Sequence, residues 1–420
     1  MRVLFISTIA PYPKSVGKKV VLGGFVDYFR QVCAPGDFKM VCFEPAAVPA
    51  DVEVTVVQKP GLLRKLWNLC FSSLLTRHKS IQESLFWSRD ASNVIDAKIA
   101  QFAPDMVLFD TVRTGQYLSG VANRSFRSVL YMDDLFSVRY ERILHAMANF
   151  PGAGIDAMGN FASNIPRFLM PLYRSSAFVK RLLLGFERDL VQKTEYRMPS
   201  DFDLALLISQ EEVRYLMTEA VIKNVRVVSP LLGMDQSRVV ARSWDGRSEF
   251  VFLGSLNLAH NAFSIETFIE RHMEQMLDSM PDCVLRIIGR FPSPRLQAMA
   301  EKFSGHVTIE GFVNDLDVML ARCAAMVAPL LFGSGVKIKV IDAVRLGVPV
   351  ISTTYGAEGI TLRDDGGILV EDDLSLFASL CKGLLDPSEN ARHSELSRQI
   401  YLEHYSPAAV EEQYGRLFAA

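Results

Sequence analysis

The segment from Leu331 to Ile360, LFGSGVKIKVIDAVRLGVPVISTTYGAEGI, constrains the fold more than any other part of the chain. It predicts a glycine loop, a helix, a short buried strand and a second glycine loop. Gly333 and Gly335 remove side chains where a backbone turns tightly or lets a ligand approach. The helix begins with Lys337 and Lys339, although cations are disfavoured at that end of a helix. Backbone amides, a helix N-terminus and two lysines together predict an anion-binding site. The alternative is an ordinary solvent-facing loop before a charged helix, which an isolated GxG would favour.

Length and composition limit the class of protein. A chain of 420 residues is too long for one hydrophobic core, so two domains are expected. A formal net charge of -2 does not predict nucleic-acid binding. The six cysteines are scattered without a CxxC pair, which indicates reduced thiols in a cytoplasmic protein. The first residues predict a strand rather than a signal peptide, and no apolar run is long enough to span a membrane.

Apolar strands alternate with helices along most of the chain, which predicts an α/β fold built from doubly wound, Rossmann-like sheets. The first series of strands ends near residue 230, and a polar stretch follows before a second series begins with the strand 250–254. We therefore expect a first domain at 1–230, a linker at 231–248, a second domain at 249–404 and a terminal helix at 405–420.

Unusual residues follow the predicted strands in both domains. In open α/β sheets, ligands bind beyond the carboxyl ends of the strands. Two domains whose carboxyl-end loops face each other would enclose a cleft between phosphate-binding loops and acids. In the first domain these residues are Gly17, Lys18, Lys19, Asp110, Asp133 and Asp134; in the second they are Gly254, Ser255, Gly289, Arg290, Gly311, Phe312, Gly333, Gly335 and Gly356.

The second half of the chain resembles a known family over residues 250–360. The matching residues are Phe252-Leu-Gly254-Ser, Asn261, Gly289-Arg290, Gly311-Phe-Val313, Ala328-Pro329, Gly333 to Lys339, Asp342, Gly347, Pro349 and Gly356-Ala-Glu358-Gly359. On these residues the chain resembles GT-B glycosyltransferases of the "glycosyl transferases group 1" type, family 4 and relatives. The first half matches more loosely, through Pro11-Tyr-Pro13, residues 132–137 and residues 209–212. The terminal helix resembles the family segment that crosses back onto the first domain.

The resemblance implies roles in binding a nucleotide-sugar donor. The backbone after Gly311, at Phe312 and Val313, would hold the base, and the Gly254-Ser255 turn would approach phosphate or acceptor, unless it is only a tight turn. Asp342 stands where the family has the second Glu of a Glu-x7-Glu motif, which binds ribose hydroxyls. The first Glu of that motif is replaced by Ser334, so Glu358 is the alternative contact to the donor sugar. The diphosphate would be held by Gly335, Lys337 and Lys339, with Arg290.

The expected mechanism needs neither a metal ion nor a cofactor, because the lysines and amides stabilise the charge that develops on the leaving diphosphate. Asp201 and Asp203, and Asp315 and Asp317, have the DxD spacing of metal-binding glycosyltransferases. We interpret them as residues at the boundaries of a strand and a helix. The histidines show no metal-ligand spacing; His145 and His260 are interpreted as structural residues or contacts to sugar.

An inverting transfer needs a base for the acceptor hydroxyl. Asp133 and Asp134 are the first candidates and Asp110 the next, although one of the adjacent pair could instead cap a helix. Lys18 and Lys19 either touch an acceptor phosphate or lie in a solvated loop.

Residues 61–87 and 165–188 predict basic amphipathic helices. Such helices either lie on an anionic membrane surface or pack over the sheet with a solvated basic face. Peripheral contact with the inner face of the cell membrane is therefore one of two open interpretations.

The sequence thus predicts a hexosyltransferase-type enzyme. It would transfer sugar from a nucleotide-diphospho-sugar to a saccharide or lipid-linked acceptor in bacterial surface polysaccharide biosynthesis. The alternatives are a GT-B nucleotide-sugar 2-epimerase and a non-catalytic nucleotide-sugar-binding subunit. A Rossmann dehydrogenase is disfavoured, because no GxGxxG follows the first strand.

Overall fold

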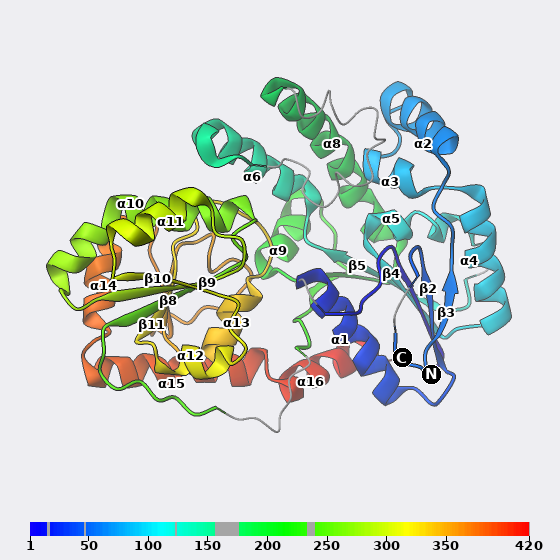
Figure 1. Cartoon of the computed structure of the whole chain (residues 1–420). Helices are drawn as coiled ribbons and strands as arrows, with labels where there is room; N and C mark the ends of the chain where they lie inside the picture. The colour runs from blue at the N-terminus through cyan, green and yellow to red at the C-terminus, as the bar shows by residue number, and fades with distance from the viewer. Residues whose placement is uncertain (15–16, 46–47, 122–123, 156–175, 233–239, 420) are drawn as a thin grey trace. The chain divides into compact units, whose positions relative to one another are not determined.

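The computed structural model describes residues 1–14, 17–45, 48–121, 124–155, 176–232 and 240–419. The chain forms two compact units (Figure 1). Unit 1 comprises residues 1–144, 157–233 and 410–420, and unit 2 comprises residues 145–156 and 234–409. Within the described ranges, no helix is both long enough and apolar enough to cross a membrane.

Unit 1 is built on a parallel sheet of seven strands in the order β3-β2-β1-β4-β5-β6-β7. Every residue of β1 and β4 is buried, as their continuous apolar sequences predict for strands covered on both faces. The strands are β1 Val3–Ser7, β2 Phe38–Cys42, β3 Glu53–Val56, β4 Met106–Asp110, β5 Arg127–Asp133, β6 Leu204–Leu207 and β7 Val225–Val227.

The helices of unit 1 lie on both faces of this sheet (Figure 1). They are α1 Gly17–Val32, α2 Leu62–Asn68, α3 Ile81–Phe86, α4 Arg89–Phe102, α5 Thr111–Gly115, α6 Phe136–Asn149, α8 Ala177–Arg197, α9 Gln210–Glu219 and α16 Pro407–Phe418. A π-helix, η1 Leu69–Leu75, continues α2, and short 3-10 turns lie at η2 Leu118–Gly120 and η6 Met198–Asp201.

One expected helix, residues 61–87, is broken in the structure. Ser80 ends the first part by capping a new helix, α3: its Oγ accepts from the Glu83 amide at 3.2 Å, and the Glu83 carboxylate accepts from the Ser80 amide at 2.9 Å. Such a reciprocal capping box marks the N-terminus of a helix, so α3 begins here instead of continuing the preceding helix. Of the second expected basic helix, 165–188, residues 165–175 lie outside the described residues and the rest belongs to α8.

Unit 2 is built on a parallel sheet of six strands in the order β10-β9-β8-β11-β12-β13. Its core contains the fully buried rings of Phe250, Phe252, Phe268 and Phe377. The strands are β8 Glu249–Leu253, β9 Val284–Ile288, β10 Val307–Gly311, β11 Ala325–Ala328, β12 Val350–Ser352 and β13 Ile368–Val370. The helices are η3 Pro151–Ala153, α10 Ala259–Ser279, α11 Pro294–Lys302, α12 Leu316–Arg322, α13 Ile338–Arg345, η7 Leu374–Leu376, α14 Phe377–Gly383 and α15 Pro387–His404.

The terminal helix α16 packs onto unit 1, although α15, which precedes it, belongs to unit 2. The rings of Tyr414 and Phe418 lie 5.4 and 6.0 Å from the ring of Phe25. Tyr414 also donates a hydrogen bond to the carbonyl of Ser229 at 2.9 Å. These buried aromatic contacts fix the end of the chain to the helix that follows β1.

Removing the Phe418 ring should therefore destabilise unit 1. We expect Phe418→Ala to lower the free energy of unfolding by about 3–5 kcal/mol, the usual cost of deleting a buried aromatic side chain. The control is Arg416→Ala, whose exposed side chain pairs with Glu412 one turn away and should matter little. Urea denaturation followed by circular dichroism measures both; equal stabilities would contradict the anchoring role.

Candidate functional site

The glycine turn before α13 wraps around the ammonium group of Lys337. Gly333 and Gly335 have φ angles of 138° and 75°, a region that side chains disfavour. Lys337 Nζ donates to the carbonyl oxygens of Ser334 at 3.0 Å and Gly335 at 2.6 Å. The carboxylate of Glu358 lies 3.8 Å from the same Nζ. The structure thus brings Ser334, Gly335, Lys337 and Glu358 together at the N-terminus of α13.

Lys339 lies next to this turn with no ion pair among the described residues. Its Nζ donates to Asn261 Oδ1 at 2.8 Å and sits 4.8 Å above the ring of Phe252. Burial, together with the charge of Lys337, lowers the pKa of Lys339 to about 7. Burial and the same two lysines lower the pKa of His260 to about 3. An anion placed here would relieve this excess of positive charge.

Asn261 joins the lysines to the turn after β8. Its Nδ2 donates to the carbonyl of Ser255 at 3.0 Å, while its Oδ1 accepts from Lys339. A Cβ at Gly254 would lie 2.8 Å from the Asn261 side chain, and one at Gly289 would lie 2.0 Å from the Gly254 carbonyl oxygen. Only glycine therefore allows the carboxyl ends of β8 and β9 to approach so closely. Asn261 is among the residues that resemble the family, but the sequence alone indicates no role for it.

The guanidinium group of Arg290 lies over the ring of Phe312 at the carboxyl ends of β9 and β10. The guanidinium carbon lies 4.2 Å from the centre of the Phe312 ring, and that ring is 64% exposed. Gly311 has a φ of 67°, which turns the chain so that Phe312 and Val313 follow at the edge of the sheet. An exposed aromatic ring stacked on arginine can receive a planar group.

Asp342 lies on α13, beyond the two lysines. Burial raises the pKa of its carboxyl to about 6, with Asp317 adding to the rise and Arg345 opposing it. Glu358 is placed at the glycine turn by Gly359, whose φ is 71° and whose position leaves no room for a Cβ beside Val336. The two carboxyl groups thus lie on different elements, and Glu358 is the one beside Lys337.

In unit 1, Lys18 joins two of the predicted acids. Its Nζ lies 2.9 Å from Asp110 Oδ1 and 4.0 Å from Asp133 Oδ2. Gly17 and Lys19 flank it in the first turn of α1. The other oxygen of Asp110 accepts from the hydroxyls of Ser7 at 3.0 Å and Thr8 at 3.3 Å. Both carboxylate oxygens of Asp110 therefore have a partner, and Lys18 lies beside both Asp110 and Asp133.

Asp133 lies at the end of β5, beside Tyr131 and Lys18. Tyr131 donates to its Oδ1 at 2.8 Å, and the residue has a φ of 70°, which is unusual for a side chain other than glycine. Burial raises the pKa of its carboxyl, and Asp134 adds to the rise, whereas Lys18 and Arg139 lower it. A base is more effective when its pKa is raised toward the working pH.

Asp134 is oriented differently from Asp133. Arg139 Nε donates to Asp134 Oδ2 at 2.7 Å, and the residue is almost fully buried. The first amides of α6, those of Phe136 and Ser137, donate to Glu195 at 2.6 and 3.3 Å. Glu195 therefore performs the capping that sequence alone could assign to Asp133 or Asp134. Tyr131 and Glu195 were not predicted, because no local pattern reveals where these buried side chains point.

The DxD pairs have structural partners. Asp203 accepts from the amide and hydroxyl of Ser128 at 2.7 and 2.8 Å, and Asp317 pairs with Arg345 at 2.6 Å. Across the part of the chain that the structure describes, no group of three or more His, Cys, Asp or Glu is placed to hold a metal ion.

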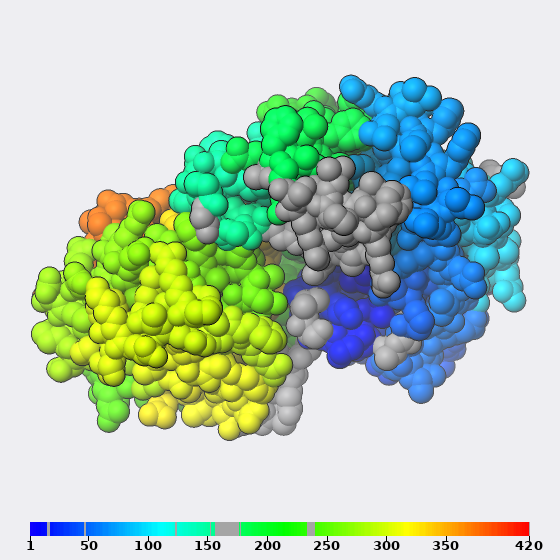
Figure 2. Space-filling model, turned by 45° about the horizontal axis from the view of Figure 1, so that its top comes forward, coloured from blue at the N-terminus to red at the C-terminus, as the bar shows by residue number. Residues whose placement is uncertain are grey.

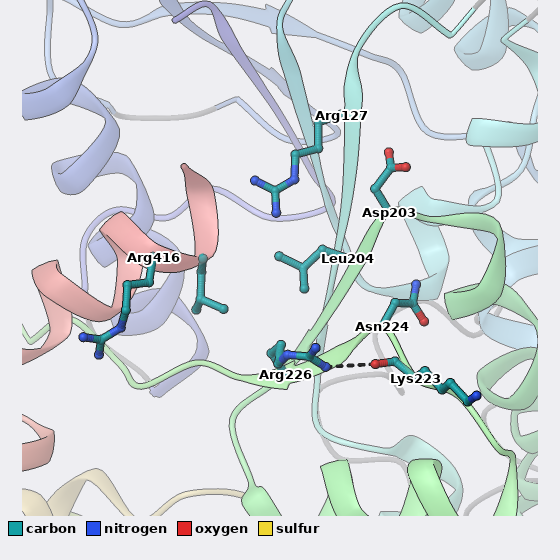
Figure 3. Close-up of a pocket in the computed structure, with 8 residues that line it drawn as sticks. Arg127, Asp203, Leu204, Lys223, Asn224, Arg226 and Arg416 are labelled. Atoms are coloured by element: carbon teal, nitrogen blue, oxygen red, sulfur yellow. Dashed lines mark hydrogen bonds between the residues drawn. The ribbon is translucent and has the colours of Figure 1, made fainter. Parts of the chain in front are cut away.

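A hollow of about 400 Å³ lies at the other edge of the unit 1 sheet, at the amino ends of β5, β6 and β7 (Figure 3). It contains none of the predicted site residues, and ligands of open α/β sheets bind at the opposite edge. Its lining residues are Arg127, Asp203, Leu204, Lys223, Asn224, Arg226, Arg416 and Leu417.

Solved structures share this architecture over the whole chain. TarM aligns with a TM-score of 0.64 at 9% identity, covering 100% of this chain and 99% of TarM. HepE from Anabaena, in complex with UDP, aligns with a TM-score of 0.58 at 11% identity over 99% of both chains. At such low identities the likeness shows the fold, which is the GT-B fold of two Rossmann-like units.

A family model matches part of unit 2. Residues 247–386 match the family model described as Glycosyl transferases group 1. This match confirms, for these residues, the resemblance seen in the sequence. The match contains the Gly254 turn, the Arg290–Phe312 pair and the lysines of α13. The family and the fold together support a role in glycosyl transfer.

One curated relative adds context. An uncharacterised 44.6 kDa protein in the cps region of Klebsiella pneumoniae is 25% identical over 146 residues. That alignment covers 33% of this chain and 37% of the relative, so the chain spans little more than a third of that protein's length.

The charge state of Lys339 gives a testable pH dependence. An adjacent diphosphate would raise the lowered pKa of about 7, so binding should take up a proton above that pH. We expect the affinity for UDP or GDP to fall as pH rises above about 7, by up to about tenfold per unit. Titration calorimetry in two buffers of different ionisation enthalpy measures both the affinity and the proton uptake.

The control for this pH dependence is Lys339→Arg, which keeps its charge at high pH. Its affinity profile should be flatter than that of the unmodified protein. An equally steep decline in both would assign the titration to another group.

Proposed function

We propose that this protein transfers a sugar from a nucleotide-diphospho-sugar to a saccharide or lipid-linked acceptor, without a metal ion or cofactor. The observation that carries the proposal is the pair Lys337 and Lys339 at the glycine turn of α13, with Lys339 lacking an ion pair among the described residues. Cations and free amides at a helix N-terminus favour an anion such as a diphosphate.

The chemistry follows from the charges that change as the bond breaks. Cleavage of the bond between sugar and diphosphate leaves negative charge on the leaving group. Lys337, Lys339 and the amides that open α13 would be aimed at that charge before the reaction starts, so little reorganisation is needed. One such donor contributes roughly 3–4 kcal/mol in comparable sites.

The remaining donor contacts follow from the same turns. The exposed face of Phe312, beside Arg290, would receive the nucleobase, and Asp342 would accept from the ribose hydroxyls. Glu358, beside Lys337, would contact the donor sugar in place of the Glu that Ser334 replaces. For an inverting transfer, Asp133 would take the proton from the acceptor hydroxyl, because Asp134 is engaged with Arg139 and Asp110 with Ser7, Thr8 and Lys18.

Relatives support the class of substrates and the biological setting. A mutant of S. aureus TarM was solved with fondaparinux, α-GlcNAc-glycerol and UDP. The Klebsiella relative is described as a protein of a cps region. We therefore place this protein in the biosynthesis of a bacterial surface polysaccharide, where a lipid-linked acceptor would bring it to the inner face of the cell membrane.

The experiment that tests this function is a donor panel. The protein is incubated with UDP-, GDP- and dTDP-sugars, with and without saccharide or lipid-linked acceptors, and with EDTA or manganese. We expect acceptor-dependent nucleotide release that EDTA leaves unchanged. Release without any acceptor would indicate a 2-epimerase or a hydrolase, and stabilisation by a nucleotide without turnover would indicate a binding subunit. Loss of activity in EDTA that manganese restores would contradict metal independence.

Lys339→Ala tests the diphosphate contact. We expect turnover to fall about a hundredfold, the effect of one lost electrostatic donor. The matched control is Lys302→Ala on α11, an exposed lysine paired with Glu274, which should keep its activity. Full activity of the Lys339 variant would show that the diphosphate lies elsewhere.

A further inference from the structure

The segment formed by α2 and η1, residues 62–75, buries polar side chains and exposes large apolar ones. A surface helix normally buries its apolar side chains and exposes its polar ones. Here the fully buried residues are polar: Asn68 and Ser73. Asn68 Nδ2 donates to the carbonyls of Ser84 and Trp87, both at 2.9 Å, and the Ser73 hydroxyl meets that of Ser84 at 2.8 Å. The segment is therefore attached to α3 by hydrogen bonds rather than by an apolar face.

Large apolar side chains of this segment are exposed to solvent. The segment forms part of the molecular surface drawn in blue in Figure 2. Leu63 is 84% exposed and Trp67 is 64% exposed. The rings of Trp67 and Phe71 stack with centres 6.0 Å apart, which makes a continuous apolar face. A contiguous exposed patch of this kind marks an interaction site. The exposed residues are Leu62, Leu63, Trp67, Phe71, Leu74 and Leu75.

The start of α8 also exposes apolar side chains. Phe178 and Leu182, one helical turn apart, are 74% and 64% exposed. Arg77, just after η1, lies with its guanidinium carbon 5.7 Å from the ring of Phe186 on α8. Glu187 on α8 accepts from the amide of Ile81 at 2.6 Å. The residues that follow the α2–η1 segment thus pack against α8 within unit 1.

The charged residues within these two stretches of sequence have one sign. Residues 61–79 contain Arg64, Lys65, Arg77, His78 and Lys79 but no Asp or Glu. Residues 177–186 contain Lys180 and Arg181 and also no acid. Exposed apolar side chains with only cations beside them match a surface that is apolar inside and anionic outside.

We propose that the α2–η1 segment is a docking surface for an anionic lipid membrane. Leu63, Trp67 and Phe71 would enter the boundary between headgroups and acyl chains, and Arg64 and Arg77 would meet the phosphates. This deepens the proposed function, since it would bring the enzyme to a lipid-linked acceptor, but the binding itself does not depend on transfer. A second copy of the chain is a poorer occupant, because a symmetric contact would bring the same cations together without an acid.

The test is cosedimentation of the full chain with vesicles of phosphatidylcholine alone or mixed with phosphatidylglycerol. We expect binding to the anionic vesicles only. The double variant Leu63→Asn, Trp67→Asn should lose at least about tenfold in binding, because two large apolar groups no longer leave water. The matched control is Leu362→Asn, Leu402→Asn, which alters two exposed leucines of unit 2 and should bind as the unmodified protein does.

The charge contribution is tested separately. Arg64→Gln should weaken binding about fivefold, the usual effect of one cation near an anionic surface. High salt should reduce this difference, because surface electrostatic attraction is screened.

Three results would overturn the proposal. The first is equal vesicle binding by both double variants, and the second is no binding to either kind of vesicle. The third is a dimer, seen by light scattering, that the Leu63, Trp67 double variant alone dissociates, because a second copy would then be the occupant. UDP affinity and transfer to a soluble acceptor should stay unchanged in this variant. Vesicle binding without any transfer would refute the proposed function alone, and transfer without vesicle binding would refute the membrane surface alone.

Discussion

The positive charge of Lys339 is the feature on which the donor side depends. Burial makes this charge costly, and Asn261 and the ring of Phe252 offset the cost only in part. Gly254 leaves room for the Asn261 side chain, and Gly289 leaves room for the backbone of Gly254. The glycine turns and the start of α13 thus hold two lysines close together, and in the proposed function a diphosphate would offset their charge.

In unit 1, the charged residues at the carboxyl ends of the strands are acids instead of lysines. Its acids are already engaged, Asp110 by hydroxyls and Lys18, and Asp134 by Arg139. Asp133 keeps a raised pKa, although a tyrosine hydroxyl and Lys18 lie beside it. In the proposed function, Lys337 and Lys339 of unit 2 would stabilise the leaving group, and Asp133 of unit 1 would accept the proton.

The fold could be predicted because continuous apolar strands and glycine turns are local features. The lysines of α13 could be predicted for the same reason, as they stand in one short segment. The contacts of Lys18, Tyr131 and Glu195 could not, because they join residues far apart in sequence. The sequence shows that residues 62–75 are amphipathic, but it does not show which face of the segment is exposed to solvent. Two buried polar residues, Asn68 and Ser73, determine which face meets solvent, and their partners are backbone and hydroxyl groups of another helix.

The most direct measurement is a crystal structure of the protein with UDP or GDP bound. The account predicts both phosphates at the turn Gly333 to Gly335, within hydrogen-bond distance of Lys339 Nζ and the first amides of α13. The base should lie against Phe312. A nucleotide bound elsewhere, with the turn empty and Lys339 still directed at Asn261, would contradict the account.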